Sequence, residues 1–470
     1  MVKSRRLTAA VAALTAVLGV AACSGSSGGG NGGGGGDENA KSITVWTTDT
    51  LPDRVAATNA IIAGFTKQTG IHVKLVGVAE DQFNQVLTSS AAAGTLPDVM
   101  GSLSLSFIRT LSANELSDPE ANAAVVDALG RDTFNKRALE LTSDGDKQLA
   151  VPSDSWAQLL VYRKDLFDAA GLAAPKTYAD ILAAAKALDT KERAGFVGAT
   201  TPGDAFTNQT FEEVGLANGC QLVDSSGKIQ FGSSNCVNAL KFYGDLINQY
   251  SVPGAQDVDT TRAAYFAGKS AMLIWSSFIL DEMAGLRNNA MPTCAQCKDD
   301  PAYLAKNSGV VTAIQGPDGS KPEAFGEVTS WTVIHDSATE SAKKFVEYMM
   351  SDGYEDWTAI APEGKFPVRS GTKDDPTAYV ENWKTLPVGV DAKAPLSKFY
   401  GDDVLAALSA GPDAFDQWGL SQGQGSLVGA MAGELPIAAA VGKVTSGDAD
   451  AQAAVKEAAD QIQSIQDSLK

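Results

Sequence analysis

The sequence predicts an α/β fold, and three stretches near its start carry that prediction. Residues 43–46 and 71–76 alternate apolar and polar side chains as strands do, while apolar residues recur at helical spacing over 55–65. Gly70 follows the helical stretch, where glycine commonly ends a helix. A strand, a helix and a second strand in this order form a βαβ unit, which predicts a pair of parallel strands. His72 falls on the polar face of the second strand, so we expect it to be solvated.

Two later helices are marked by a cap and by an apolar face. Thr177 and Asp180 have the spacing of a capping box, and the residues after them place apolar side chains on one helical face. Near the C-terminus, apolar residues from Val455 to Leu469 recur at helical spacing, which predicts an amphipathic helix that begins near Asp448. These helices extend the α/β pattern to the end of the chain.

Length and composition indicate a folded protein with more than one domain. The chain has 470 residues, which at ~150 residues per domain is enough for two or three domains. Its 37 Lys and Arg residues stand against 56 Asp and Glu residues, a formal net charge of -19, and 44% of its residues are hydrophobic. This composition is typical of a soluble globular protein. Because a phosphate backbone repels a strongly acidic surface, we expect no nucleic-acid partner.

Residues 1–22 have the features of a signal peptide. Lys3, Arg5 and Arg6 form a basic start, and the run 7–22 is uncharged and rich in Ala, Val and Leu. This run is shorter than the ~20 residues that a membrane-spanning helix needs, so an embedded anchor is the less favoured interpretation. The two adjacent arginines leave twin-arginine export open as an alternative route.

Cys23 ends the sequence Val20-Ala-Ala-Cys23, which resembles the bacterial lipobox. In that motif the cysteine thiol is acylated and becomes the new N-terminus, and each buried methylene contributes ~0.8 kcal/mol to membrane anchoring. Residues 24–36 are only Ser, Gly and one Asn, so we expect 23–40 to be the lipidated cysteine and a flexible tether. The sequence therefore predicts an extracytoplasmic protein anchored by lipid to the outer face of the cell membrane. Ordinary secretory cleavage is the alternative.

The other four cysteines suit an oxidising compartment. We expect disulfides Cys220–Cys236 and Cys294–Cys297, because each closes a short local loop, although other pairings stay open. The alternatives for Cys294 and Cys297 are a redox pair or half of a four-cysteine zinc site. No strand feeds a helix there, which disfavours a redox motif, and the chain has only two histidines. We therefore expect neither a metal nor a cofactor.

Several short motifs look catalytic but have the wrong context. Residues 267–270 end like a phosphate-binding loop, yet Ala263 stands where the first glycine of that loop belongs. Residues 25–29 match a nucleophile elbow only because the tether is rich in Gly and Ser. Glu212 and Glu213 are neighbours on a predicted helix, where side chains point about 100° apart, so we expect a solvated helix surface. The sequence therefore predicts no catalytic residue.

A set of stretches in a fixed order carries a resemblance to a known family. These are Ile43–Trp46, Phe65–Val73, Ala93–Val99, Val151–Trp156, Tyr162–Leu172, Pro175–Thr177, Tyr265–Met272 and Gly442–Ala454, spread over nearly all of 41–470. Their order and spacing resemble bacterial extracellular solute-binding proteins of family 1, which are similar to maltose-binding protein. Those proteins are the oligosaccharide-binding components of ABC importers.

The resemblance implies a type II periplasmic-binding-protein-like fold, in which hinge strands join two α/β lobes and the ligand lies in the cleft between them. Lobe one would comprise 41–150 and 327–375, and lobe two 151–326 and 376–470. Binding would shift the population towards a closed form that the importer recognises. The implied partners are a sugar or oligosaccharide and the ABC permease subunits, with the chain acting as a monomer and not as an enzyme. A secreted carbohydrate-active enzyme, an adhesion or sensory protein, and a receptor for a glycerol-phosphate ester are the alternatives.

Sugar chemistry and the family's cleft positions together give the candidate ligand-binding residues. Sugar rings stack their C–H faces on aromatic side chains, and their hydroxyls need polar partners once desolvated. The candidates are Asp49, Asp81, Gln82, Ser102, Ser104, Asp154, Trp156, Asp204, Asn208, Trp275, Ser276, Phe278, Trp331, Arg369 and Trp418. Each tryptophan could instead belong to a core, and Arg369 could pair with a surface carboxylate. Trp156 stands where maltose-binding protein has an acidic residue, which argues against maltose as the ligand.

Overall fold

The structure is a computed structural model that describes residues 40–470. Residues 1–39, including Cys23, lie outside the described residues. The signal peptide, the lipid anchor and most of the tether therefore stay predictions.

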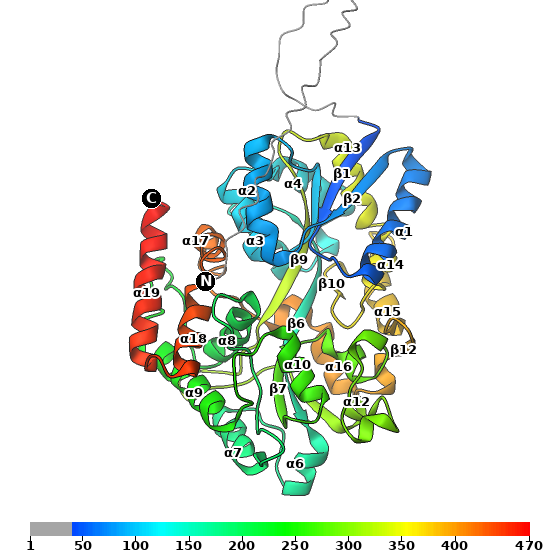
Figure 1. The fold of residues 1–470 in the computed structure, drawn as a ribbon. Helices are drawn as coiled ribbons and strands as arrows, with labels where there is room; N and C mark the ends of the chain where they lie inside the picture. The colour runs from blue at the N-terminus through cyan, green and yellow to red at the C-terminus, as the bar shows by residue number, and fades with distance from the viewer. Residues whose placement is uncertain (1–39) are drawn as a thin grey trace, which may run out of the picture. The chain divides into compact units, whose positions relative to one another are not determined.

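The predicted βαβ unit is present at the start of the described chain (Figure 1). Strand β1 (Ser42–Thr47) pairs in parallel with β2 (His72–Gly77), and helix α1 (Pro52–Thr69) connects them. Gly70 ends α1 with a φ of 73°, a backbone conformation that glycine adopts without strain. His72 is exposed, as predicted.

The central sheet has the strand order β10-β6-β9-β3-β1-β2. Strand β3 (Val99–Leu103) pairs in parallel with β1 and antiparallel with β9 (Gly326–Val333). Strand β9 in turn pairs with the first half of the long strand β6 (Val151–Arg163), and β10 (Phe366–Pro367) pairs with β6 on its other side. Three segments distant in sequence therefore meet along β6.

The second half of β6 belongs to a different part of the molecule. Its residues 158–163 pair with β7 (Met272–Ser276) and β8 (Ser308–Val311). Strands β6 and β9 thus run through the centre of the described structure and connect an upper lobe to a lower lobe in Figure 1. This is the two-lobed α/β architecture that the resemblance implies.

Helices cover both lobes. Around lobe one lie α1, α2 (Phe83–Ala93), α3 (Leu105–Ala113), α4 (Pro119–Leu129), α5 (Lys136–Leu141), α13 (Thr339–Met349) and α14 (Tyr354–Thr358). In lobe two lie α6 (Lys164–Ala170), α7 (Tyr178–Leu188), α8 (Ala205–Ala217), α9 (Ser234–Tyr250), α10 (Val258–Phe266), α11 (Ile279–Met283) and α12 (Tyr303–Asn307). The C-terminal part adds α15 (Ala378–Thr385), α16 (Asp402–Ser409), α17 (Gly425–Met431), α18 (Pro436–Ser446) and α19 (Ala451–Ser468).

Short elements complete the described chain. Two small hairpins pair β4 (Ser143–Asp144) with β5 (Lys147–Gln148) and β11 (Pro387–Val388) with β12 (Ala394–Pro395). Single 3₁₀ turns lie at η1 (Glu80–Gln82), η2 (Arg131–Thr133), η3 (Asn288–Ala290), η4 (Gln296–Lys298), η5 (Leu396–Lys398) and η6 (Gly411–Ala414).

Each lobe buries two apolar clusters. Phe65 and Trp331 belong to one lobe-one cluster and Phe83 to the other, while Tyr243 and Trp275 mark the two clusters of lobe two. Five buried residues that the predicted boundaries give to lobe two pack in lobe-one clusters: Val151 and Ala324, near the ends of 151–326, and Tyr379, Phe415 and Leu420 of the C-terminal segment. The C-terminal segment therefore contributes to both lobes, and the boundaries themselves stay predictions.

Local sequence signals agree with the observed caps and disulfides. Thr177 and Asp180 form both hydrogen bonds of the capping box at the start of α7, and Asp450 caps α19. The disulfides are Cys220–Cys236 and Cys294–Cys297, as predicted.

Among residues 40–470 no group of three or more His, Cys, Asp or Glu side chains is arranged to hold a metal ion. In the same part of the chain, no single helix has the length and apolar character to cross a membrane. Helices α17 and α18 have this length and character only when they are taken together, and the angle between them is 52°.

The predicted solvated surface at Glu212 and Glu213 is wrong. Both side chains are buried on α8, which packs against α9 and α18. Glu212 accepts a hydrogen bond from the backbone N–H of Trp418 at 2.6 Å, and Glu213 accepts one from the N–H of Phe325. Burial raises the pKa of Glu212 to about 8 and that of Glu213 well above its usual value. These carboxyls bind loop backbone to α8, a long-range contact that helical periodicity does not reveal.

Candidate functional site

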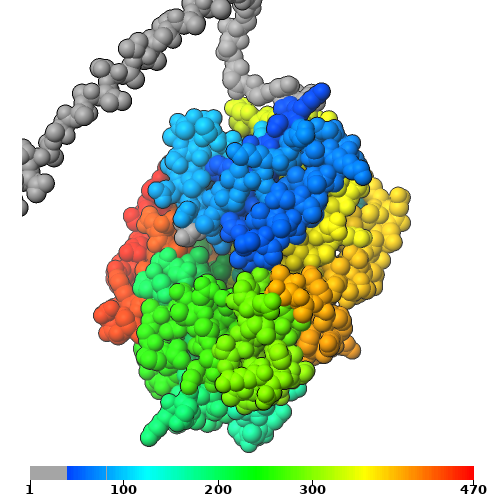
Figure 2. All heavy atoms as spheres, turned by 45° about the vertical axis from the view of Figure 1, so that its right-hand side comes forward, coloured from blue at the N-terminus to red at the C-terminus, as the bar shows by residue number. Residues whose placement is uncertain are grey.

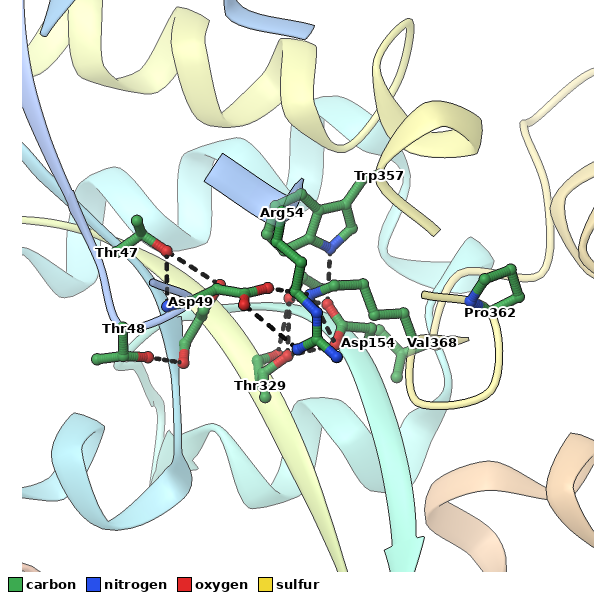
Figure 3. Close-up of polar contacts among 12 residues, drawn as sticks. Thr47, Thr48, Asp49, Arg54, Asp154, Thr329, Trp357, Pro362 and Val368 are labelled. Atoms are coloured by element: carbon green, nitrogen blue, oxygen red, sulfur yellow. Dashed lines mark hydrogen bonds and ion pairs between the residues drawn. The ribbon is translucent and has the colours of Figure 1, made fainter. Parts of the chain in front are cut away.

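The loop after β1 reaches the edge of lobe one that faces lobe two. Thr48 donates its hydroxyl to the carbonyl of Ser102 at 2.6 Å, and the hydroxyls of Thr47 and Ser102 lie 3.3 Å apart (Figure 3). The N–H of Asp49 donates to Thr47 Oγ1 at 3.1 Å. These bonds join the carboxyl ends of β1 and β3 and fix the position of Asp49. Ligands of parallel α/β sheets commonly bind at such an edge.

Asp49 is held by two cations. Arg54 on α1 lies 3.3 Å from Asp49 Oδ1, and Lys365 lies 3.5 Å from Asp49 Oδ2. Although burial alone would raise the pKa of the Asp49 carboxyl, the charges of Lys365 and Arg54 lower it below its usual value. Asp49 is therefore a buried, ionised carboxylate.

Asp154 on β6 ties the crossing strands to lobe one. It accepts hydrogen bonds from Trp357 Nε1 at 2.6 Å, from the hydroxyl of Thr329 at 2.6 Å and from that of Ser153 at 2.7 Å (Figure 3). Lys365 Nζ lies 3.9 Å from Asp154 and also 3.9 Å from the centre of the Trp357 ring. Since its oxygens are already bonded within the protein, Asp154 holds Lys365 and the strand crossing in place.

Lobe two faces this network with residues that follow β7. The Arg54 guanidinium lies 4.5 Å from the centre of the Phe278 ring, which is close enough for a cation–π contact. Arg287 lies 3.4 Å from Asp53 of lobe one and 3.8 Å from Asp281 of lobe two. Figure 2 shows the N-terminal residues of lobe one, in blue, meeting the green residues of lobe two along this seam.

A third segment, residues 361–368, lies beside the seam. Gly364 packs so closely on Phe278 that a Cβ atom at this glycine would lie 2.1 Å from the ring. Its neighbour Glu363 is buried, and burial together with the charge of Asp281 raises the pKa of Glu363 well above its usual value. Burial likewise raises the pKa of Asp281 to about 6. We call Asp49, Arg54, Asp281, Arg287, Glu363 and Lys365 the crevice cluster.

Several buried polar atoms in and beside the crevice cluster have no hydrogen-bond partner in the protein. They are Arg54 Nε, Ser277 Oγ, Asp281 Oδ1, Arg287 Nε and Glu363 Oε2. A buried donor or acceptor without a partner costs ~1–3 kcal/mol, and more when charged. The set contains both donors and acceptors and draws on lobe one, lobe two and segment 361–368. Such a set can bind a ligand rich in hydroxyl groups, because each hydroxyl both donates and accepts.

The structure brings four of the predicted ligand-binding residues to this region and gives others local roles. Asp49, Ser102, Asp154 and Phe278 lie in the contacts described above. Ser104 caps α3 and Asp204 caps α8, each by accepting a backbone N–H. Asn208 lies on α8, one turn after Asp204. Ser276 is the last residue of β7, and Gln82 is exposed at η1. Asp81 is also in η1, and its side chain lies outside the described atoms.

The predicted aromatic platforms are mostly inside the cores. Trp331 is fully buried between Trp357 and Phe345, with ring centres 5.0 and 5.7 Å away. Trp275 and Trp418 are also buried, and their indole N–H groups donate to the carbonyls of Val258 and Cys220. Trp156 is half-buried and packs on Phe325. Arg369 is buried in lobe one and donates to the carbonyl of Leu129 and the hydroxyl of Thr133, so it pairs with no surface carboxylate.

Sequence reasoning missed most of the crevice cluster, namely Arg54, Asp281, Arg287, Glu363 and Lys365. Each lies within ten residues of a candidate, yet only tertiary packing buries its charge. A charged residue is usually exposed, so an isolated Arg or Glu gives no signal in the sequence.

Comparison with known proteins agrees with this architecture. A sequence profile of the bacterial extracellular solute-binding proteins matches residues 48–356, which is more than half of the chain. The chain belongs to this family. It is 29% identical over 324 residues to the protein named ABC transporter periplasmic-binding protein YcjN of Escherichia coli strain K12, a match that covers 67% of this chain and 70% of that protein. The family consists of substrate-binding proteins and not of enzymes, and its members act outside the cytoplasm.

Solved structures of two-lobed binding proteins share the fold. The GacH receptor of Streptomyces glaucescens, determined without ligand and with acarbose, has a TM-score of 0.69 at 20% identity, covering 90% of this chain and 98% of that one. MalE3 of T. maritima with bound maltose has a TM-score of 0.69 at 19% identity, covering 90% and 99%. A sugar transporter of Arthrobacter chlorophenolicus with bound laminaribiose has a TM-score of 0.69 at 18% identity, covering 90% and 99%.

Proposed function

We propose that the chain captures a sugar or short oligosaccharide between its lobes and delivers it to the permease of an ABC importer. The observation that carries the proposal is the set of buried, unpartnered donors and acceptors of the crevice cluster, together with Ser277, which both lobes and segment 361–368 supply. A ligand that touches both lobes at once binds the closed form better than the open form, and this difference is what drives closure.

The relatives support a carbohydrate ligand. The similar structures include receptors with bound acarbose, maltose and laminaribiose. The crevice supplies the chemistry that such ligands need, since its carboxylates accept hydrogen bonds from hydroxyls and its arginines donate to them.

The charges around the crevice argue against an anionic ligand such as a glycerol-phosphate ester. Besides Glu363, whose raised pKa keeps it neutral, four carboxyl groups lie at or beside the seam, on Asp49, Asp53, Asp154 and Asp281, against three cations, Arg54, Arg287 and Lys365. A phosphate would add negative charge to a buried region in which carboxyls already outnumber cations. A neutral, hydroxyl-rich sugar avoids this repulsion.

The proposal includes a lipid anchor at Cys23 and a tether up to residue 40. An anchored receptor stays near the permease, and the Gly- and Ser-rich tether would let the lobes turn freely at the membrane surface. Labelling of growing cells with a fatty-acid analogue is expected to mark the wild type and not Cys23→Ala.

A ligand screen tests the binding function. Mono-, di- and oligosaccharides are added to the purified protein, and the melting temperature is measured, because a ligand that binds the folded state raises it by mass action. We expect at least one sugar to stabilise the protein and to be recovered intact by chromatography after overnight incubation. Asp281→Ala and Glu363→Ala should bind that sugar at least ten-fold more weakly, whereas Asp460→Ala, at an exposed position of α19, should match the wild type. Stabilisation by no sugar, or cleavage of the sugar, would contradict the proposal.

A further inference from the structure

Two adjacent residues at the start of α1 meet opposite charges on lobe two. Asp53 Oδ2 accepts a hydrogen bond from Arg287 Nη2 at 3.4 Å. Its neighbour Arg54 covers the Phe278 ring at 4.5 Å, and its positive charge favours the ionised form of the buried Asp281 carboxyl. The lobes are therefore joined by two contacts, an ion pair of Asp53 with Arg287 and a cation–π contact of Arg54 with Phe278. We call Asp53, Arg54, Phe278, Asp281 and Arg287 the seam contacts.

The seam contacts are largely shielded from water. The side chain of Arg287 is 5% exposed, that of Asp281 1% and that of Asp53 27%. Attraction between charges is stronger in such surroundings than on an open surface, and salt screens it less. An exposed ion pair contributes only ~0–1 kcal/mol, so this burial is what makes the contacts significant.

Arg287 makes contacts in both lobes. Its Nη1 atom lies 3.8 Å from Asp281 of lobe two, and its Nη2 atom lies 3.4 Å from Asp53 of lobe one. When the lobes separate, the contacts of Arg287 with Asp53 and of Arg54 with Phe278 are lost, while the pair of Arg287 with Asp281 stays within lobe two.

We propose that the seam contacts form a latch that holds the lobes together without any ligand, and that Arg287 is its main positioning residue. All of the contacts are between side chains of the protein, so no ligand atom is needed to form them. Closure then depends partly on the latch and partly on the ligand. If the closed state is already populated, a ligand needs less of its binding energy to close the lobes, and its apparent affinity rises accordingly.

Distances between the lobes in the free protein test the latch. Lys67→Cys on α1 and Lys186→Cys on α7 place labels on exposed positions of lobes one and two, in a full-length chain that carries Cys23→Ala. The four remaining cysteines are in disulfides, so the labels attach only to the introduced thiols. Pulsed electron–electron double resonance then gives the distribution of distances between the two spin labels with no sugar added.

We expect the unmodified seam to give a population at the short distance of the closed form. Arg287→Gln should reduce that population about ten-fold, and Asp53→Asn should shift it in the same direction by less. Arg262→Gln is the matched control, because the contacts of Arg262 with Asp259, Glu282 and the Trp275 ring all lie within lobe two. Its distribution should match that of the unmodified seam.

Two results would overturn the latch: the same distance distribution in Arg287→Gln and in the unmodified seam, or an equal shift in Arg262→Gln. Circular dichroism of each variant distinguishes loss of the latch from loss of the fold. The measurement needs no sugar, so it separates the latch from the proposed function. A failed ligand screen beside a positive latch result would count against sugar binding alone.

Discussion

At the scale of single residues, a charged side chain that is buried where the lobes meet needs hydrogen-bond or ion-pair partners within the protein. Asp154 illustrates this rule, because three neutral donors and Lys365 surround its carboxylate. A buried carboxyl group without such partners would be costly. The residue therefore serves the strand crossing more than it serves the ligand.

Replacing Asp154 by alanine tests this role. Asp154→Ala leaves the indole N–H of Trp357 and the ammonium of Lys365 without their acceptor, and breaking a buried pair costs ~3–5 kcal/mol. We expect the free energy of unfolding, measured by denaturation in urea, to fall by about 3 kcal/mol. Asp460→Ala is the control, since Asp460 pairs with Lys456 on an exposed face of α19 and should change stability by under ~0.5 kcal/mol. A similar loss in both variants would refute the assigned role.

At the scale of elements, features set by neighbouring residues could be predicted from the sequence. The first strand, the helix that ends at Gly70 and the capping box of Thr177 each depend on short-range spacing. Burial by distant segments could not be predicted in this way. The carboxyl of Glu213 is buried because Phe325, more than a hundred positions away, donates to it. Trp331 looked like a ligand platform because polar residues precede it, yet its ring fills a core.

The packing of Trp331 on strand β3 gives a prediction at this scale. A Cβ atom at Gly101 would lie 2.1 Å from the Trp331 ring, so Gly101→Ala must displace a fully buried indole. Overpacking of this kind costs ~1–3 kcal/mol. We expect the midpoint of denaturation to fall accordingly. In Gly433→Ala the nearest atom to the new Cβ is the Ala430 oxygen at 3.7 Å, an ordinary contact, so this control should keep the wild-type midpoint. Equal midpoints for the two variants would contradict this packing.

At the scale of the whole molecule, buried acids connect the lobes through the strand crossing. Glu327 on β9 accepts the backbone N–H of Leu105 at the start of α3 in lobe one, at 3.0 Å. Burial raises the pKa of Glu327 to about 7 and that of Glu282 to about 7. The pKa values of these two groups, of Glu212 and of Asp281 are higher in the folded chain than in the unfolded chain, so folding is coupled to proton uptake. The same residues could not be recognised in the sequence, because 56 acidic residues offer many equivalent candidates.

These raised pKa values fix the sign of the pH dependence of stability. In the unfolded chain the carboxyls ionise near pH 4–4.5, whereas in the folded chain burial keeps Asp281 protonated to about pH 6 and Glu212 to about pH 8. Between these limits the folded state binds more protons, so the free energy of unfolding should decrease as pH rises from 5 to 8. Carboxyls with a lowered pKa, such as Asp49, act in the opposite sense and lose their contribution as the solution becomes strongly acidic.

Glu212→Gln isolates one of these groups. The amide keeps the oxygen that accepts the Trp418 N–H but cannot ionise, so it resembles the protonated acid. Because one pKa unit corresponds to ~1.4 kcal/mol, we expect the free energy of unfolding of Glu212→Gln to exceed that of the wild type by on the order of 4 kcal/mol at pH 8 and to be close to it at pH 4.5. Glu457→Gln, whose carboxylate is half-exposed beside Lys443, should follow the wild-type curve. Denaturation in urea at each pH measures the difference, and a Glu212→Gln curve parallel to that of the wild type would show that Glu212 is already ionised in the folded protein.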